Sequence, residues 1–120
     1  MNILIADDNN AYRPSIKSYI HKLWPEALVY EESNLDSVIR DVFDINYELL
    51  ILATDIPGNE QLEDFVKQAV KYTKVIIFSD DVEDDAKANR LIQIGADTLM
   101  LKSAMEEEVI STLLFVFDQS

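Results

Sequence analysis

Short apolar runs alternate along the chain with segments in which apolar residues recur every three or four positions. The runs are rich in branched side chains and end at acidic or turn-forming residues. Such runs are typical of buried strands, whereas the wider spacing is typical of amphipathic helices. Strands are expected at residues 3–6, 27–30, 49–53, 75–78 and 98–101, and helices at 12–23, 35–42, 62–70, 88–94 and 109–117.

Residues with special backbone properties mark the ends of several of these elements. Pro14 falls in the first turn of the first helix, where its missing N–H costs no hydrogen bond. Trp24-Pro25 is expected to end that helix, because the residue before a proline disfavours helical geometry. Asn34 suits the N-cap of the second helix, and Gly95 suits a left-handed position after the fourth.

Five strand–helix units with short connections predict an α/β fold, a doubly wound five-stranded parallel sheet with five helices on its two faces. Residues 1–120 are expected to form one domain, since no linker or repeat interrupts the pattern. In such sheets the functional crevice lies at the carboxyl ends of the strands, where the strand order reverses. The residues that directly follow each strand are therefore the candidates for function.

The composition excludes most catalytic motifs. The only glycines, Gly58 and Gly95, are too far apart for a GxxxxGK[ST] loop or a GxGxxG turn. Cysteine is absent, which excludes disulfides, thiol nucleophiles and CxxC zinc sites. Because His21 is the single histidine, an HExxH metal site is excluded as well. Carboxylate chemistry remains, with or without a hard cation, or no chemistry at all.

The charge limits the partners. There are 23 acidic and 10 basic residues, which gives a formal charge of −13. A domain this acidic repels phosphate backbones and anionic lipids, so direct nucleic-acid or membrane binding is not expected. No apolar run approaches the roughly 20 residues that span a bilayer. The N-terminus lacks the basic region of a signal peptide, and the absence of cysteine fits a cytoplasmic location.

Acidic, hydroxyl and basic side chains follow the predicted strands. Asp7 and Asp8 follow the first strand, Asp55 comes shortly after the third, Ser79 follows the fourth and Lys102 the fifth. Acids, a hydroxyl and a lysine at one edge of a sheet favour a site for a hard cation and a phosphoryl group.

Four segments resemble the receiver domains of two-component response regulators: IADDN at 5–9, LLILATDIPG at 49–58, VIIFS at 75–79 and GADTLMLKSA at 95–104. The first and last are phrased like the subgroup fused to helix-turn-helix DNA-binding domains. The resemblance implies the flavodoxin-like strand order 2-1-3-4-5. It also implies that Asp7 and Asp8 hold Mg²⁺ and that Ser79 and Lys102 contact the phosphoryl group.

Two positions depart from that family. The phosphoacceptor aspartate is expected four residues before the proline of the Pro-Gly turn, and Ala53 stands there. An alanine can neither attack a phosphoryl group nor bind a cation, so any Mg²⁺ site is expected to be weak or vestigial. At the switch position, three residues before the lysine, the aromatic residue is replaced by Leu99.

The expected function is that of an atypical receiver domain, a pseudo-receiver. It would act in signal transduction or transcription regulation through phosphorylation-independent protein contact or dimerisation, without enzymatic activity or a required cofactor. Lys102 is expected to pair with Asp7 or Asp8. Two alternatives remain open. Asp55 could accept phosphate, although two residues advance it by about 6–7 Å along the strand, into the loop above the site. Alternatively, a metabolite could occupy the pocket left empty at Ala53.

The last predicted helix contains five consecutive apolar residues, 113–117, which cannot all lie on one buried face. Leu114, Phe115 and Val116 are therefore expected to form an interface, for a second copy or a protein partner. A DNA-binding domain could follow in the natural protein. The acidic run at 80–85 is read as a solvated loop or as an acidic rim over the site.

Overall fold

The computed structural model describes residues 1–9, 11–42, 44–80 and 86–118. The acidic run lies outside these residues, apart from Asp80. The strands are β1 (Asn2–Ala6), β2 (Leu28–Glu32), β3 (Leu49–Ala53), β4 (Lys74–Ser79) and β5 (Thr98–Leu101). The helices are α1 (Arg13–Leu23), α2 (Leu35–Asp41), α3 (Leu62–Ala69), α4 (Ala86–Ile94) and α5 (Glu106–Asp118), with a 3-10 turn, η1 (Asn59–Gln61), before α3.

The strands form one parallel sheet in the order β2-β1-β3-β4-β5. The predicted α/β architecture and strand order are confirmed. β1 lies between β2 and β3, so the order reverses beside it, and residues after β1 and β3 face the resulting crevice.

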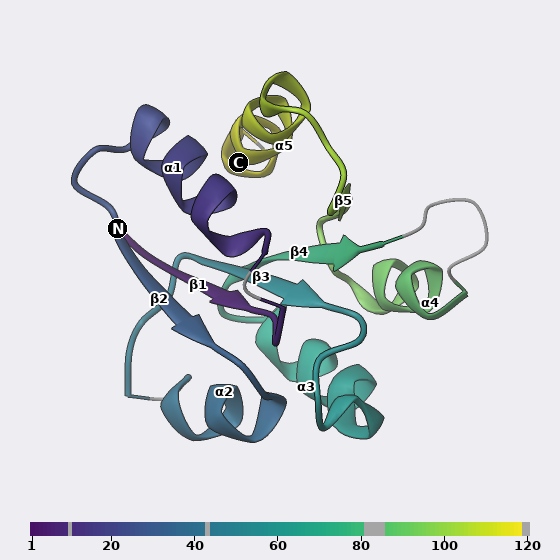
Figure 1. The fold of residues 1–120 in the computed structure, drawn as a ribbon. Helices are drawn as coiled ribbons and strands as arrows, with labels where there is room; N and C mark the ends of the chain where they lie inside the picture. Colours follow the sequence, from purple (N-terminus) through teal and green to yellow (C-terminus); the bar gives the residue numbers. More distant parts are fainter. Residues whose placement is uncertain (10, 43, 81–85, 119–120) are drawn as a thin grey trace.

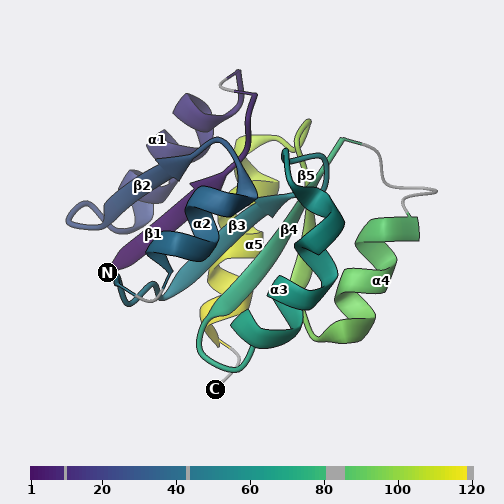
Figure 2. The same ribbon diagram turned by 90° about the horizontal axis from the view of Figure 1, so that it is seen from below.

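Helices cover both faces of the sheet. Helices α1 and α5 lie on one face, and α2, α3 and α4 lie on the other (Figures 1 and 2). Side chains of β3 alternate between these layers: Leu49 and Ile51 pack toward α1 and α5, and Leu50 and Leu52 pack toward the other helices. Every residue of β3 is buried, as expected for a central parallel strand. No described helix is long and apolar enough to cross a membrane.

Strand β2 differs from its prediction, because it begins at Leu28 and continues through Glu31 and Glu32. The two glutamates are in register with Ile5 and Ala6 of β1. Backbone pairing with β1 thus extends the strand beyond its apolar residues. The pattern of apolar residues could not predict this extension, because both added residues are acidic.

Two predicted helix ends are confirmed, the N-cap of α2 at Asn34 and the end of α4 at Gly95. The Asn34 side chain accepts a hydrogen bond from the backbone N–H of Ser37 at 2.8 Å, which caps α2. After α4, the N–H of Ala96 bonds to the carbonyl of Leu91 at 3.1 Å, and the N–H of Gly95 bonds to that of Ile92 at 3.1 Å. Gly95 has a φ of +136°, which explains why glycine closes this helix.

Replacing Asn34 by alanine should lower the free energy of unfolding by about 1 kcal/mol, because the first turn of α2 loses its side-chain cap. Urea unfolding followed by circular dichroism measures this change. Asn89→Ala, at an exposed position within α4, is the control and should leave stability unchanged or slightly raised. Equal losses in the two variants would contradict the capping role.

Candidate functional site

The candidate site lies at the carboxyl ends of the central strands. Asp7 directly follows β1, Asp55 comes two residues after β3, Asp80 follows β4 and Lys102 follows β5. The parallel arrangement brings these four connections to one edge of the sheet. Residues up to 95 positions apart in the sequence therefore meet here.

The ammonium group of Lys102 is the centre of this site. Its side chain is only 2% exposed. Its Nζ lies 3.3 Å from Oδ2 of Asp7, 3.1 Å from Oδ1 of Asp55 and 4.0 Å from Oδ1 of Asp80. The rings of Tyr12 and Phe78 lie 5.9 and 5.7 Å from Nζ. One buried cation thus faces three carboxylates and two aromatic rings.

Burial alone would lower the pKa of Lys102, because it disfavours the charged form. The hydrogen bond to Asp55 and the charges of Asp7, Asp55 and Asp80 outweigh burial, and the pKa is raised. The backbone fixes the side chain's origin, since the Lys102 N–H donates to the carbonyl of Ser79 at 2.8 Å. Lys102 is therefore a buried ammonium group that faces acids at the ends of three other strands.

The two adjacent acids have different environments. Asp7 is fully buried, and its Oδ1 accepts a hydrogen bond from the backbone N–H of Asn9 at 3.1 Å. Its Oδ2 is buried and has no hydrogen bond, although Lys102 lies beside it. Burial raises the pKa of Asp7, despite the opposing effects of the Asn9 N–H and of Lys102. Asp8, in contrast, is exposed. Of the two partners expected for Lys102, the structure shows Asp7.

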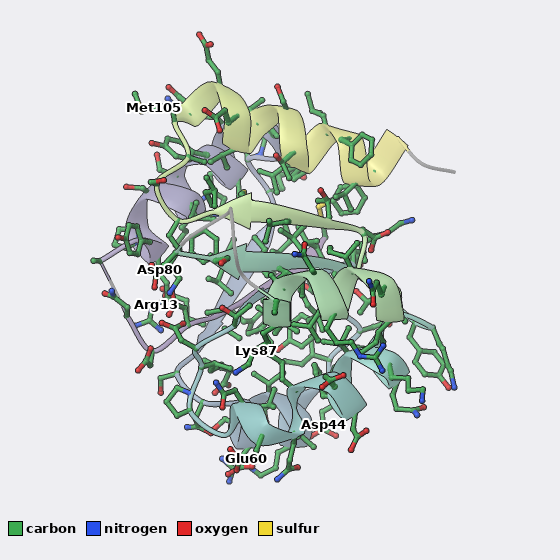
Figure 3. All side chains as sticks on the ribbon, turned by 90° about the vertical axis from the view of Figure 1, so that its right-hand side faces the viewer. Arg13, Asp44, Glu60, Asp80, Lys87 and Met105 are labelled. Carbon is green, nitrogen blue, oxygen red and sulfur yellow. The ribbon has the colours of Figure 1, made fainter. Side chains whose placement is uncertain are left out.

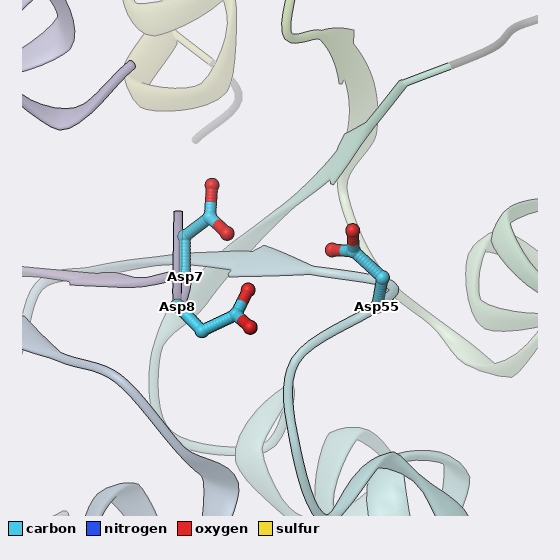
Figure 4. A group of neighbouring side chains, drawn as sticks. All are labelled: Asp7, Asp8 and Asp55. Carbon is cyan, nitrogen blue, oxygen red and sulfur yellow. The ribbon is translucent and has the colours of Figure 1, made fainter. Parts of the chain in front are cut away.

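Asp55 lies closer to the site than its sequence position suggested. It does lie in the loop after β3, and its side chain is 53% exposed. However, its carboxylate turns inward and contacts Lys102. Single oxygens of Asp7, Asp8 and Asp55 all lie within 4.8 Å of one another, and Figure 4 shows the three carboxylates facing a shared space. The expectation that Asp55 stays above the site is wrong, because the turn directs the side chain back to it.

The other residues expected at the site lie on strands β3, β4 and β5. Ala53 is fully buried at the end of β3, where its backbone pairs with Phe78 and its methyl belongs to the core under α2, α3 and α4. Ser79 is buried at the end of β4. Leu99 is half-buried and packs against the same core as Ala53. Sequence reasoning had not placed Tyr12 beside the lysine.

The structure corrects the proposed surface of α5. Val116 is fully buried and belongs to the same core cluster as Val109 and Leu113. Leu113 follows Val109 by four positions and Val116 follows Leu113 by three, so the three side chains lie on the inner face of the helix. Leu114 and Phe115 are 43% and 50% exposed. Any interface on this helix is therefore built on Leu114 and Phe115, and Val116 belongs to the core.

Asp7→Asn should stabilise the protein at neutral pH. A carboxyl whose pKa is higher in the folded than in the unfolded state binds more protons when folded, so the stability that it contributes falls as pH rises above its unfolded value of 3.8. The neutral amide avoids this loss. The gain in unfolding free energy should be present at about pH 7 and shrink toward about pH 4.

Urea unfolding at several pH values measures this difference. Asp8→Asn is the matched control at an exposed neighbour, and it should leave the unfolding midpoint nearly unchanged. A loss of stability in Asp7→Asn at neutral pH would show that the charged form of Asp7 is the favoured one.

No protein-family model and no curated protein matches the chain. Among solved structures, it is similar to the signal receiver domain of a DNA-binding response regulator (merR) from Colwellia psychrerythraea 34H, with 19% identity, a TM-score of 0.83 and 99% of each chain covered. The receiver domain of a LuxO repressor protein from Vibrio parahaemolyticus gives 22% identity and a TM-score of 0.81, covering 98% of this chain and 90% of that one. The non-phosphorylated receiver domain of RcsB from Escherichia coli gives 17% and 0.83, covering 98% and 93%. The chain therefore has the fold of response-regulator receiver domains.

Proposed function

We propose that this chain is a receiver-like signalling domain that does not accept phosphate at the usual position and acts through contact with other proteins. One observation carries the proposal. The lysine that would contact a phosphoryl group is instead held by the carboxylates of Asp7 and Asp55, beside a fully buried alanine at the acceptor position.

The chemistry of the acceptor position supports this reading. Formation of an aspartyl phosphate needs a carboxylate nucleophile, and the methyl group of Ala53 has neither a lone pair nor a charge. Ala53 is also 0% exposed, so this position offers no open surface to a ligand. We therefore do not propose a ligand sensor at that position.

The ion pairs of Lys102 support a site in which this side chain keeps one position. Losing the lysine from this buried pair would typically cost about 3–5 kcal/mol, because the charge of Asp7 would stay buried without compensation. Neutralising Asp7 does not carry that cost, because Asp55 and Asp80 still face the lysine. In an ordinary receiver, a new phosphoryl group would offer the lysine another anion. Without that group, nothing offsets the loss of Asp7 and Asp55, and the lysine stays in place. Leu99 also lacks the ring whose rotation would report a change at the site.

A divalent cation fits the donor set only in competition with Lys102. Asp7, Asp8 and Asp55 would hold Mg²⁺, since carboxylate oxygens are its preferred protein ligands. However, the ammonium group already contacts two of these three carboxylates. We propose that Mg²⁺ binding is weak and that the cation would serve only to neutralise the acids.

A second candidate function is a working phospho-receiver that uses Asp55. It is favoured by the contact of 3.1 Å between Asp55 and Lys102, which resembles the pairing of an acceptor carboxylate with its lysine. The half-exposed carboxylate is also accessible to a phosphodonor. This candidate is second because Asp55 lies in the turn two residues past the strand and lacks the backbone pairing that would hold it in β3.

For the route of signalling, we propose the exposed surface of α5 around Leu114 and Phe115 as a contact for a second copy or a protein partner. The formal charge of −13 disfavours nucleic acid as a direct ligand. By analogy with the DNA-binding response regulator from Colwellia psychrerythraea, a role in transcription regulation would then require a separate DNA-binding unit.

Acetyl phosphate, or beryllofluoride with Mg²⁺, should cause no saturable change in the tyrosine and tryptophan fluorescence or in the amide NMR spectrum. The reason is that neither reagent finds a carboxylate at residue 53. A saturable response that disappears in Asp55→Asn but persists in Asp44→Asn, an exposed acid elsewhere, would overturn the proposal in favour of the second candidate.

Size measurement over a wide concentration range tests the α5 surface. We expect self-association that weakens at least about tenfold in Phe115→Ser, because an exposed aromatic ring is a common anchor of interfaces. Tyr72→Ser, which removes an exposed ring from the connection before β4, is the control and should have no effect. A wild-type chain that remains a strict monomer at the highest concentration would remove the dimer and leave only a hetero-partner for this surface.

A further inference from the structure

Two neighbouring hollows lie at the opposite end of the sheet from the carboxylate cluster, where β3 and β4 begin. Their volumes are about 410 and 480 Å³. They share four lining residues from the connections that precede these strands, namely Asn46, Tyr47, Tyr72 and Thr73. The hollows therefore adjoin at these residues, and the two together are called the groove here. Figure 3 shows Asp44, which lines it, away from Asp80 and Met105 at the end that holds the cluster.

The first hollow is mainly apolar. Its lining includes the apolar side chains of Val42, Ile45, Phe65 and Ala69 and the rings of Tyr47 and Tyr72. The Tyr47 ring is buried and held edge-on against Tyr30, with centroids 5.5 Å apart. Tyr72, in contrast, is 79% exposed and stands where the two hollows meet. An apolar hollow of this volume with one firmly held aromatic wall suits the body of a small organic ligand, for which pockets of about 300–1,000 Å³ are usual.

The second hollow is polar, and its charged side chains differ in the partners that they contact. The carboxylate of Glu48 accepts a hydrogen bond from the backbone N–H of Asn2. The Asp97 carboxylate accepts from the N–H of Val75 at 2.8 Å and lies 4.0 Å from Lys74. Lys71 Nζ donates to the neutral side chain of Gln68 at 3.3 Å and forms no ion pair within the described part of the chain.

From this arrangement we propose that the groove binds a small organic carboxylate. The apolar or aromatic body would occupy the first hollow, and the carboxylate would lie at Lys71. Asp44 is the charged residue that lines the first hollow, and it repels an anion placed there. The acids of the second hollow, Glu48 and Asp97, already have the partners named above, so Lys71 is the group that remains for the ligand's carboxylate. Asp44 disfavours the reverse orientation. This site is independent of the function proposed above, because it shares no residue with the cluster around Lys102.

Phenylpropionate is a suitable probe, and its neutral amide is the matched ligand control. Titration of the isotope-labelled full chain should give saturable amide NMR shifts at Tyr47, Tyr72 and Thr73, with Asp55 and Lys102 unmoved. The amide should bind about tenfold more weakly, because it loses the charge-assisted hydrogen bond to the lysine. Shifts centred on Asp55 and Lys102 would assign binding to the other end of the molecule and overturn the proposal.

Variants of two lysines on the same side of the sheet separate a specific contact from general charge. Lys71→Gln should weaken phenylpropionate binding about tenfold and abolish the preference over the amide. Lys67→Gln removes the same charge from an exposed position on α3 that lines neither hollow, and should change neither quantity. Equal effects of the two variants, or no saturable binding by the wild-type chain, would also overturn the proposal.

Discussion

The arrangement of side chains at the carboxyl ends of the strands centres on one buried positive charge. Lys102 follows β5, and its ammonium group contacts acids that follow β1 and β3, with a third acid after β4 at 4.0 Å. Four of the five strands are thus joined at their carboxyl ends by a single side chain. The three carboxylates would otherwise repel one another, and the buried Asp7 would lack any counter-ion. The lysine therefore neutralises these acids from within the chain, as a bound cation would do from outside.

This pairing explains how the site keeps its shape although residue 53 is an alanine. The methyl group of Ala53 joins the apolar core, and the carboxylate that contacts the lysine comes from Asp55, two residues later. The pKa values of Asp7 and Lys102 are both raised, but for opposite reasons. For Asp7, burial outweighs its favourable contacts, whereas for Lys102 the surrounding acids outweigh burial. The three acids therefore stabilise the charged form of Lys102 more than Lys102 stabilises the charged form of Asp7.

Much of the fold was predictable, because a fully buried strand such as β3 is a continuous apolar run and caps such as Asn34 and Gly95 have backbone requirements that few residues meet. The site was predictable only in part. The order of the strand ends predicts that Asp7 and Lys102 meet, but the direction of Asp55 depends on a turn that no periodicity describes. Val116 could have been assigned to the core from the sequence, because it continues the helical spacing of Val109 and Leu113. Its apolar neighbours in the run 113–117 made the buried positions hard to tell from the exposed ones.

The most direct test of the central claim is a double-mutant cycle for the free energy of unfolding, with Asp7→Asn and Lys102→Met alone and combined. If Lys102 is the counter-ion of Asp7, the amide should be more stabilising when the lysine is absent, and the two changes should be coupled by about 1–3 kcal/mol. Additive changes, within about 0.5 kcal/mol, would contradict the account. In that case the contact of 3.3 Å between the two groups would carry no energy, and another interaction would have to hold the strand ends together.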